Sequence, residues 1–446
     1  MSDLRKSIQK ESSLLLKLGG PIIATQLLRT GLNFTDTVMA GNLSALDLAG
    51  VAIGNAIYMP IAVFCMATLV AINPIVSQLL GARKFEEIGR SARQMFWVIL
   101  FLTIPCIIII RNLDIIMRII GVTPEIIPLA QGYLKGISWG ILPLFAYAGV
   151  RYFSEGLSVT RPAMYIAAVS LVLNVGANYV LMYGKLGFPA MGGVGAGYAT
   201  SLLNLFSAIV FIYFTMRFKP FIRFNIFARI KRPDITLIKE FLRIGLPNGA
   251  SSAMEVLLFA SVSLLMGTLS VNAAASHQVA LNVASTMFMI PFGLSMAISQ
   301  RVGFSFGQGS MAKARFRGFV GIGICGLIMT VTAIFLFTIP ESIVRIYTSD
   351  PAVKDMAVSL LFMAGLFQIS DGFQVGGFGA LRGLKDTRVP MIANFIAYWV
   401  IGFPAGYMLG IHLGYGPQGL WIGLISGLSV AAVLHNYRFN KLSKVS

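Results

Sequence analysis

Long apolar runs recur through the whole chain of 446 residues, and each could cross the roughly 30 Å hydrocarbon core of a bilayer as a helix. A backbone in lipid must satisfy its own hydrogen bonds, which leaves only helices and closed barrels as spanning structures. Barrel strands are about 9–11 residues long and alternate apolar with polar side chains, whereas these runs are longer and apolar on all sides. The sequence therefore predicts an all-α integral membrane protein with twelve transmembrane helices. Their approximate cores are 14–39, 48–79, 94–110, 129–150, 162–183, 192–216, 241–266, 275–300, 318–340, 356–380, 389–410 and 418–435.

Charged residues make up only 12% of the chain and hydrophobic residues 56%, whereas soluble domains are roughly a quarter charged. This composition disfavours cytosolic enzymes and nucleic-acid binders. The net charge of +18 has a topological explanation, because 28 of the 35 Lys and Arg residues fall at one set of span ends. Under the positive-inside rule those ends, and with them both termini, are cytoplasmic. We expect a multi-pass protein of the plasma (cytoplasmic or inner) membrane that contacts the lipid bilayer and no nucleic acid.

The two halves of the chain resemble each other. Residues 15–44 align without a gap to residues 241–270 at an offset of 226, and the alignment pairs Pro21 with Pro247. Six spans per half is an even number, so both halves enter the membrane in the same direction as parallel repeats. We predict two six-helix lobes, 1–216 and 241–446, joined by a basic cytoplasmic linker at 217–240. Two such bundles suit transport by alternating access. A channel of this size would more often be built as a symmetric oligomer. We therefore expect a transporter that is a monomer.

Three acidic residues remain inside the predicted spans after the loops are set aside: Asp36, Glu255 and Asp371. A carboxylate at bilayer depth costs several kcal/mol unless it is paired or faces water, which makes each a candidate functional group. At about 1.5 Å of rise per helical residue, Asp36 lies in the outer half of its span and the other two lie near the midplane. The alternative is that these groups only hold helices together through polar contacts.

Polar residues of the fifth and sixth spans are expected at the depth of Asp36. Asn174 and Asn178 lie one turn apart on the same face, and Thr200 lies on the next span. Carboxylate, amide and hydroxyl oxygens are ligands that a hard cation such as Na⁺ would use. The same asparagines could instead bond helix to helix. His277 is expected to be a loop or helix-end residue.

Several local motifs resemble those of one transporter family over essentially the whole chain. They are DTVMAG (36–41), GARKFEEIGR (81–90), GKLGFPAMGGVGAGYAT (184–200), ASHQVALN (275–282) and GLKDTRVPM (383–391). The chain resembles the multidrug and toxic compound extrusion (MATE) transporters. Acids in the seventh and tenth spans, here Glu255 and Asp371, are a mark of the NorM-type branch of this family.

The resemblance implies an antiporter that exports organic, often cationic and amphipathic compounds in exchange for inward Na⁺ or H⁺. It assigns Glu255 and Asp371 to a cation site in the C-terminal lobe. A second cation site, found in the N-terminal lobe of some members, corresponds here to Asp36, Asn174, Asn178, Ala196 and Thr200. The transported compound is expected at Glu255, Asp371, Phe367 and Asp36. Phe367 departs from the family pattern, because the family commonly has a tyrosine one turn before the acid of the tenth span.

Other classes of function are less well supported by the residues. A flippase of lipid-linked precursors shares the wider fold, but it often has extra spans and a more basic cavity. An enzyme is least favoured, because the loops contain no nucleophile–base set, metal-ligand spacing or phosphate-binding loop. We therefore expect no cofactor beyond the coupling ion.

Overall fold

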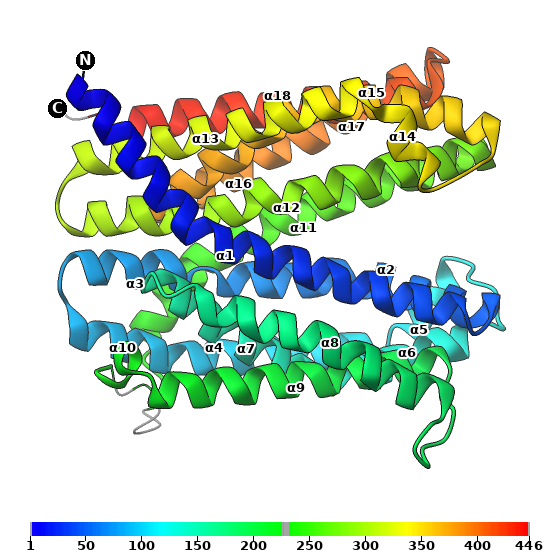
Figure 1. Cartoon of the computed structure of the whole chain (residues 1–446), viewed down its shortest axis with the longest axis horizontal. Helices are drawn as coiled ribbons and strands as arrows, with labels where there is room; N and C mark the ends of the chain where they lie inside the picture. Colours follow the sequence, from blue (N-terminus) through cyan, green and yellow to red (C-terminus); the bar gives the residue numbers. More distant parts are fainter. Residues whose placement is uncertain (1, 225, 227–231, 445–446) are drawn as a thin grey trace. The chain divides into compact units, whose positions relative to one another are not determined.

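The structure, a computed structural model, describes residues 2–224, 226 and 232–444, and every regular element within these ranges is a helix (Figure 1). The first half contains α1 (Ser2–Gly41), α2 (Ala45–Leu69), α3 (Ile72–Gly81), α4 (Phe85–Arg111), α5 (Asp114–Ile119), α6 (Ile127–Ser138), α7 (Ile141–Gly156), α8 (Arg161–Tyr183), α9 (Gly193–Arg217) and α10 (Lys219–Ile222). The second half contains α11 (Ile235–Leu269), α12 (Val271–Gly307), α13 (Met311–Thr338), α14 (Pro340–Arg345), α15 (Pro351–Gly383), α16 (Arg388–Phe395), η1 (Ile396–Gly402), α17 (Phe403–Tyr407), η2 (Met408–His412) and α18 (Gly416–Leu442).

The helices agree with the twelve predicted spans. Among the described residues, 10 helices are long and apolar enough to cross a membrane, with α2 and α3 joined as Ala45–Gly81 and α16 to η2 joined as Arg388–His412. The remaining two predicted spans correspond to α1 and to the pair α6 and α7. That pair is interrupted at Trp139 and Gly140, so each piece is short by itself. The fold prediction of an all-α protein with twelve spans is confirmed.

The two halves differ in how regular their helices are. The second span of the first half breaks between α2 and α3, and the fourth breaks between α6 and α7, whereas their counterparts α12 and α15 are continuous. In the fifth span the difference is reversed. There α8 is regular, and its counterpart in the second half contains the two π-helical segments η1 and η2. The helix order is repeated, but the local geometry has diverged.

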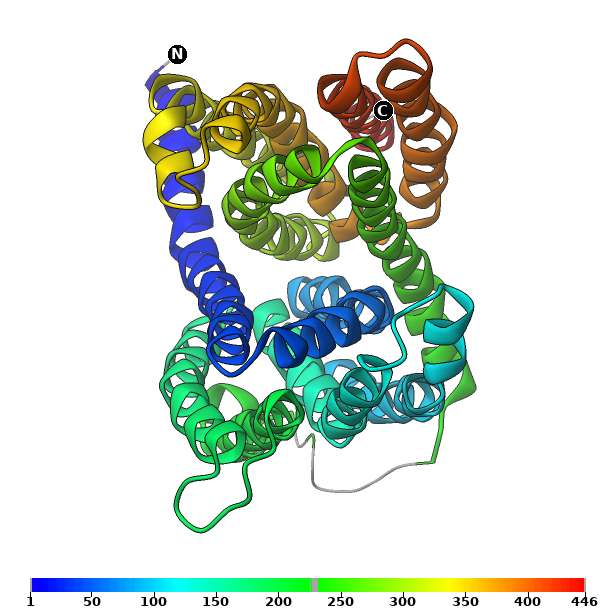
Figure 2. The ribbon, with the colours of Figure 1, turned by 90° about the vertical axis from the view of Figure 1, so that its right-hand side faces the viewer.

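The chain forms two compact units. One contains residues 1–23 and 250–446, and the other contains residues 24–249. Within each unit the long helices lie side by side, and Figure 2 looks along their axes. The predicted lobes are 1–216 and 241–446, whereas these units divide the chain inside α1 and α11, two or three residues after Pro21 and Pro247. The predicted linker 217–240 lies partly outside the described residues.

A buried ion pair holds the first part of α1 in the unit of residues 250–446. Glu11 is only 6% exposed, and its two oxygens accept hydrogen bonds from Arg301 Nε at 2.7 Å and Arg301 Nη2 at 2.5 Å. Arg317 of α13 approaches the same carboxylate at 3.4 Å. Arg315, also on α13, donates to the carbonyl of Asn440 near the end of α18. These contacts place the first part of α1 and the last part of α18 at the same end of this unit (Figure 1).

We expect Glu11→Gln to lower the melting temperature of the purified protein clearly. Removing one partner of a buried ion pair leaves an uncompensated charge and costs about 3 kcal/mol. The matched control is Glu87→Gln, because Glu87 pairs with Lys84 at the surface, where both side chains are more than half exposed. Exposed pairs contribute about 0–1 kcal/mol. Equal melting temperatures for the two variants would show that the Glu11 contact does not stabilise α1.

Asp234 sets the start of α11 in the other unit. Its Oδ1 accepts hydrogen bonds from the backbone N–H groups of Thr236 and Leu237, which caps the helix. Its other oxygen is paired with the guanidinium of Arg90 on α4. The Arg90 hydrogen bond, together with the backbone N–H groups, holds the pKa of Asp234 below its usual value. Asp234 is therefore ionised at neutral pH, as the cap requires.

Candidate functional site

Asp36 lies at the centre of a buried polar cluster within the unit of residues 24–249. Its Oδ1 accepts hydrogen bonds from Asn174 Nδ2 at 3.0 Å and Asn178 Nδ2 at 2.6 Å, both on α8. Its Oδ2 accepts one from the Thr200 hydroxyl of α9 at 3.1 Å. Asp36 is 6% exposed, Asn174 1% and Asn178 0%. The structure therefore brings together the acid, the two asparagines and the threonine that the sequence singled out.

The orientation of the amides determines what this cluster can do chemically. Both asparagines turn their N–H groups toward Asp36, so the carboxylate is held by three donors and no oxygen cage surrounds it. Three donors stabilise an ionised carboxylate. Asn178 Oδ1 is buried and accepts no hydrogen bond from the described residues. Binding of Na⁺ here would require the amides to rotate so that their oxygens face the ion.

Ala196 and Arg29 lie on helices that contribute to this cluster. Ala196, assigned to this site by the resemblance, is fully buried on α9, one turn before Thr200. It has no side-chain polar atom, so only its small size or its backbone carbonyl would be available to such a site. Arg29, on the same helix as Asp36, places its guanidinium 5.3 Å from the ring centre of Tyr147. The local environment of Arg29 is thus aromatic.

Glu255 and Asp371 form the second candidate site, within the unit that contains residues 250–446. Glu255 lies near the middle of α11 and is half-buried, and Asp371 on α15 is 0% exposed. The two carboxylates are close enough to interact electrostatically. Neither takes part in a salt bridge within the described ranges, and both Asp371 oxygens are buried without a hydrogen-bond donor from those residues. Unlike Asp36, Asp371 is a buried acid whose oxygens have no hydrogen-bond partner in the described part of the chain.

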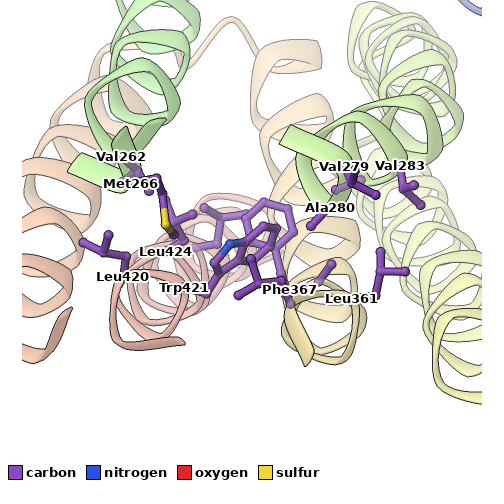
Figure 3. Packing of buried hydrophobic residues seen from close by; sticks show 14 of the residues in the cluster. Val262, Met266, Val279, Ala280, Val283, Leu361, Phe367, Leu420, Trp421 and Leu424 are labelled. Carbon is purple, nitrogen blue, oxygen red and sulfur yellow. The ribbon is translucent and has the colours of Figure 1, made fainter. Parts of the chain in front are cut away.

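Phe367 lies one turn before Asp371 and belongs to an aromatic cluster. Its ring centre is 5.9 Å from that of Phe259 and 5.9 Å from that of Trp421. Figure 3 shows Phe367 beside Trp421, among buried side chains that include Val262, Met266 and Leu424. Phe367 is only 4% exposed. In this conformation it packs in the core of the unit, and contact with a transported compound would require that core to open.

The sequence reasoning missed one residue at the acidic pair and misjudged another nearby. Tyr398 of η1 is fully buried and within electrostatic range of both Glu255 and Asp371. His277, expected at a loop or helix end, is 1% exposed inside α12. Its Nε2 lies 3.0 Å from the Ser263 hydroxyl, and its ring contacts Trp421. Tertiary packing around Trp421 buries His277, which its neighbours in sequence do not reveal.

The two acidic groups differ from the usual metal sites of proteins. Within the described parts of the chain, no group of three or more His, Cys, Asp or Glu side chains could hold a metal ion. The acidic groups instead form an isolated carboxylate with amide and hydroxyl donors in one unit and a carboxylate pair in the other. Intramembrane carboxylates of this kind mark ion and substrate pathways.

A twelve-span helical protein with carboxylates buried inside its spans has the features of a membrane transport protein. Its family follows from the sequence. The MatE family model matches residues 21–180 and again residues 247–408, and the two matches begin at Pro21 and Pro247, which the internal repeat pairs. The chain belongs to the MatE family.

Named relatives and solved structures agree with this assignment. The multidrug resistance protein MdtK of Yersinia enterocolitica is 39% identical over 439 residues, covering 97% of this chain and 96% of the relative. MdtK of Yersinia pseudotuberculosis is 38% identical with the same coverage. The eukaryotic MATE transporter AtDTX14 has the same fold, with a TM-score of 0.88 at 21% identity over 98% of both chains. A multidrug resistance MATE family transporter in an outward-facing conformation also has a TM-score of 0.88, at 21% identity over 97% of this chain and 96% of that one.

Proposed function

We propose that the protein is a secondary active antiporter of the NorM-type branch that exports organic cations in exchange for inward Na⁺ or H⁺. Relatives named as multidrug resistance proteins cover nearly the whole chain, which supports export of several amphipathic compounds. The coupling ion is the only cofactor in this proposal. The protein acts as a monomer in the cytoplasmic (inner) membrane with both termini in the cytoplasm, in keeping with the distribution of basic residues.

The main structural support for the proposal is the pair of carboxylates Glu255 and Asp371. Two carboxylates near each other inside the membrane, without a basic partner among the described residues, repel each other when both are ionised. A bound cation or proton relieves this repulsion, and so does a cationic compound. Because both ligands neutralise the same charge, binding of one disfavours binding of the other, which is the basis of exchange.

Alternating access turns this competition into transport. When the carboxylates face the outside, a cation binds and lowers the cost of closing the cavity around them. After the cavity opens inward, the cation leaves and the re-exposed charges attract the organic cation by electrostatics and apolar contact. Each charge that moves inward across 100 mV gains about 2.3 kcal/mol, which is ample to drive export.

The Asp36 cluster serves as a second cation site in this proposal. Its asparagine and threonine donors already hold the carboxylate, so a cation has to displace or rotate them. This requirement couples ion binding in the first half to movement of α8 and α9 against α1. In this proposal the Asp36 cluster binds only the ion, whereas the Glu255 and Asp371 pair binds either the ion or the exported compound.

Efflux from vesicles tests the proposal, with a fluorescent organic cation such as ethidium as the substrate. Purified protein is reconstituted, and a Na⁺ gradient at constant pH, a pH gradient without Na⁺, or no gradient is imposed. We expect efflux under at least one of the gradients, with a rate that saturates as substrate is raised. Transport that requires neither gradient, or a flux that does not saturate, would refute antiport.

A further inference from the structure

A groove of about 680 Å³ lies between the first part of α1 and α13, within the unit that contains residues 1–23 and 250–446. The first part of α1 crosses α13 there (Figure 1). Ile8 and Ser12 line it from α1, and α13 contributes one face, at spacings of three and four residues from Ala312 to Leu327. Because α13 is long and apolar enough to cross a membrane, this groove is open to lipid.

The groove is polar at one end and apolar along the rest of its length. Of the described residues that line it, Ser12 and Arg315 have polar side chains and the others are apolar. Ile8 is 42% exposed, Phe319 38% and Leu327 66%. At about 1.5 Å of rise per residue, Leu327 lies about 18 Å along α13 from Arg315. A phospholipid has the same division, with a polar head group joined to long apolar chains.

Gly323 keeps the apolar part of the groove open. A Cβ atom at this position would meet no described atom of another helix or side chain within 4 Å. Gly323 lies about 12 Å along α13 from Arg315, a distance that an acyl chain spans easily. Glycine inside a helix is unfavourable relative to alanine, so helix stability does not explain its presence here. The open space at Gly323 suits an acyl chain.

Arg315 is held in place at the polar end by neutral partners. Its Nη1 donates to the Asn440 carbonyl at 2.9 Å and to the Ser443 hydroxyl at 3.1 Å, and its Nη2 donates to Asn440 Oδ1 at 2.6 Å. Its guanidinium carbon lies 5.0 Å from the ring centre of Phe319. These hydrogen bonds use three of the five N–H groups of an arginine, and none of their acceptors is charged. The guanidinium is therefore oriented, its charge is not neutralised by these partners, and a phosphate matches its remaining N–H groups.

The charges around this end of the groove also favour an anion. Residues 2–17 carry four basic and two acidic side chains, and residues 311–317 carry three basic and no acidic ones. One of the two acids, Glu11, is already engaged by Arg301 and Arg317. This end of the unit is cytoplasmic in the proposed topology, and anionic lipids of the cytoplasmic leaflet attract basic segments.

We propose that this groove binds an anionic phospholipid, such as phosphatidylglycerol, with its phosphate at Arg315 and one acyl chain along the apolar wall past Gly323. Basic pockets between membrane helices bind anionic head groups in this way. The bound lipid contacts both α1 and α13, and it therefore helps to hold the first part of α1 in this unit. A zwitterionic lipid fills the apolar part equally well but gains less at Arg315. This inference does not depend on antiport, because lipid binding is measured without transport.

Native mass spectrometry of the purified protein measures the affinity for the first lipid bound, with phosphatidylglycerol and phosphatidylcholine of identical acyl chains as the two probes. We expect phosphatidylglycerol to bind about fivefold more tightly, the worth of one arginine near an anionic lipid. Arg315→Gln should bind both lipids equally. Arg315→Lys keeps the charge but not the three contacts with α18, and it should keep most of the preference. Equal affinities for the wild type, or equal loss of preference in both variants, would overturn the role of the Arg315 charge.

A phosphatidylglycerol with a photoreactive diazirine in one acyl chain tests the position of the lipid. We expect crosslinks to concentrate in residues 316–327 of α13, and most of them to disappear in Gly323→Leu, whose side chain fills the groove. The matched control is Gly176→Leu on α8, because Gly176 is also an exposed helical glycine whose Cβ would meet nothing within 4 Å. It should leave the crosslinks on α13 unchanged.

Three outcomes would reject the lipid site. Crosslinks spread evenly over the exposed helices would mean that lipid contacts α13 without a specific site. Crosslinks on α13 that persist in Gly323→Leu would place the acyl chain outside the groove. A dimer in the native mass spectrum, with α13 protected from the photoreactive lipid, would assign the groove to a second copy of the chain.

Discussion

Replacing Asp371 with asparagine is expected to reduce gradient-driven efflux roughly a hundredfold, because an ion contact with a buried charge is worth up to about 3 kcal/mol. Asparagine keeps the size of the side chain and removes the charge that the ion and the exported cation share. Glu255→Gln should reduce efflux as well, but less, because Glu255 is only half-buried and Asp371 is fully buried. The measurement is the initial rate of efflux from vesicles under the driving gradient.

The control for this pair is Glu125→Gln, which removes an exposed acid outside the long helices. It should transport at the wild-type rate. Detergent melting curves of all three variants show whether any loss of efflux is a loss of folding. Because neither Asp371 oxygen accepts a hydrogen bond from the residues that the structure describes, Asp371→Asn should fold at least as well as the wild type. If both acidic variants transported normally, the carboxylate pair would have no part in coupling.

The second large effect is expected at Asp36. Asp36→Asn places an N–H group where Asn174, Asn178 or Thr200 now donates, so at least one buried donor loses its acceptor at a cost of about 1–3 kcal/mol. We expect both a lower melting temperature and a loss of most efflux. These two effects together do not separate a cation site from a contact that only joins α1 to α8 and α9.

A charge swap separates the two roles. Asp36→Asn combined with Asn178→Asp returns one carboxylate and one amide to the same buried cluster but moves the charge from α1 to α8. We expect the swap to restore the melting temperature and to leave efflux low, because the ion needs the charge on α1. Recovery of both quantities would mean that the cluster only holds the helices together. The readouts are thermal melting and efflux of the single and double variants.

Several parts of this fold could be predicted from the sequence because the pattern of residues along the chain determines them. The spans follow from apolar runs that must be helical in lipid, and the repeat follows from a nearly constant offset. The meeting of Asp36 with Asn174 and Asn178 was also predictable, because helical rise places residues at defined depths. Both asparagines also lie one turn apart, which puts them on one face of α8.

Other parts depend on packing that the sequence does not display. The break between α6 and α7 at Trp139 and Gly140 and the π-helical turn at Tyr398 arise where neighbouring helices pack, and apolar periodicity does not distinguish them from regular helix. Tyr398 is one of 14 tyrosines, and only the fold brings it to the acids. The direction of the Asn174 and Asn178 amides is likewise a tertiary property, and it determines whether the cluster presents donors or oxygens.

The division of the chain inside α1 and α11 has a consequence for how the protein can be taken apart. Residues 1–23 complete the unit built from residues 250–446, and the first part of α11, up to Gly249, completes the other. A chain cut in the linker at 217–240 would therefore give two fragments, each lacking a helical segment that the other fragment carries. Two separately expressed halves would have to exchange these helix ends before either unit was whole.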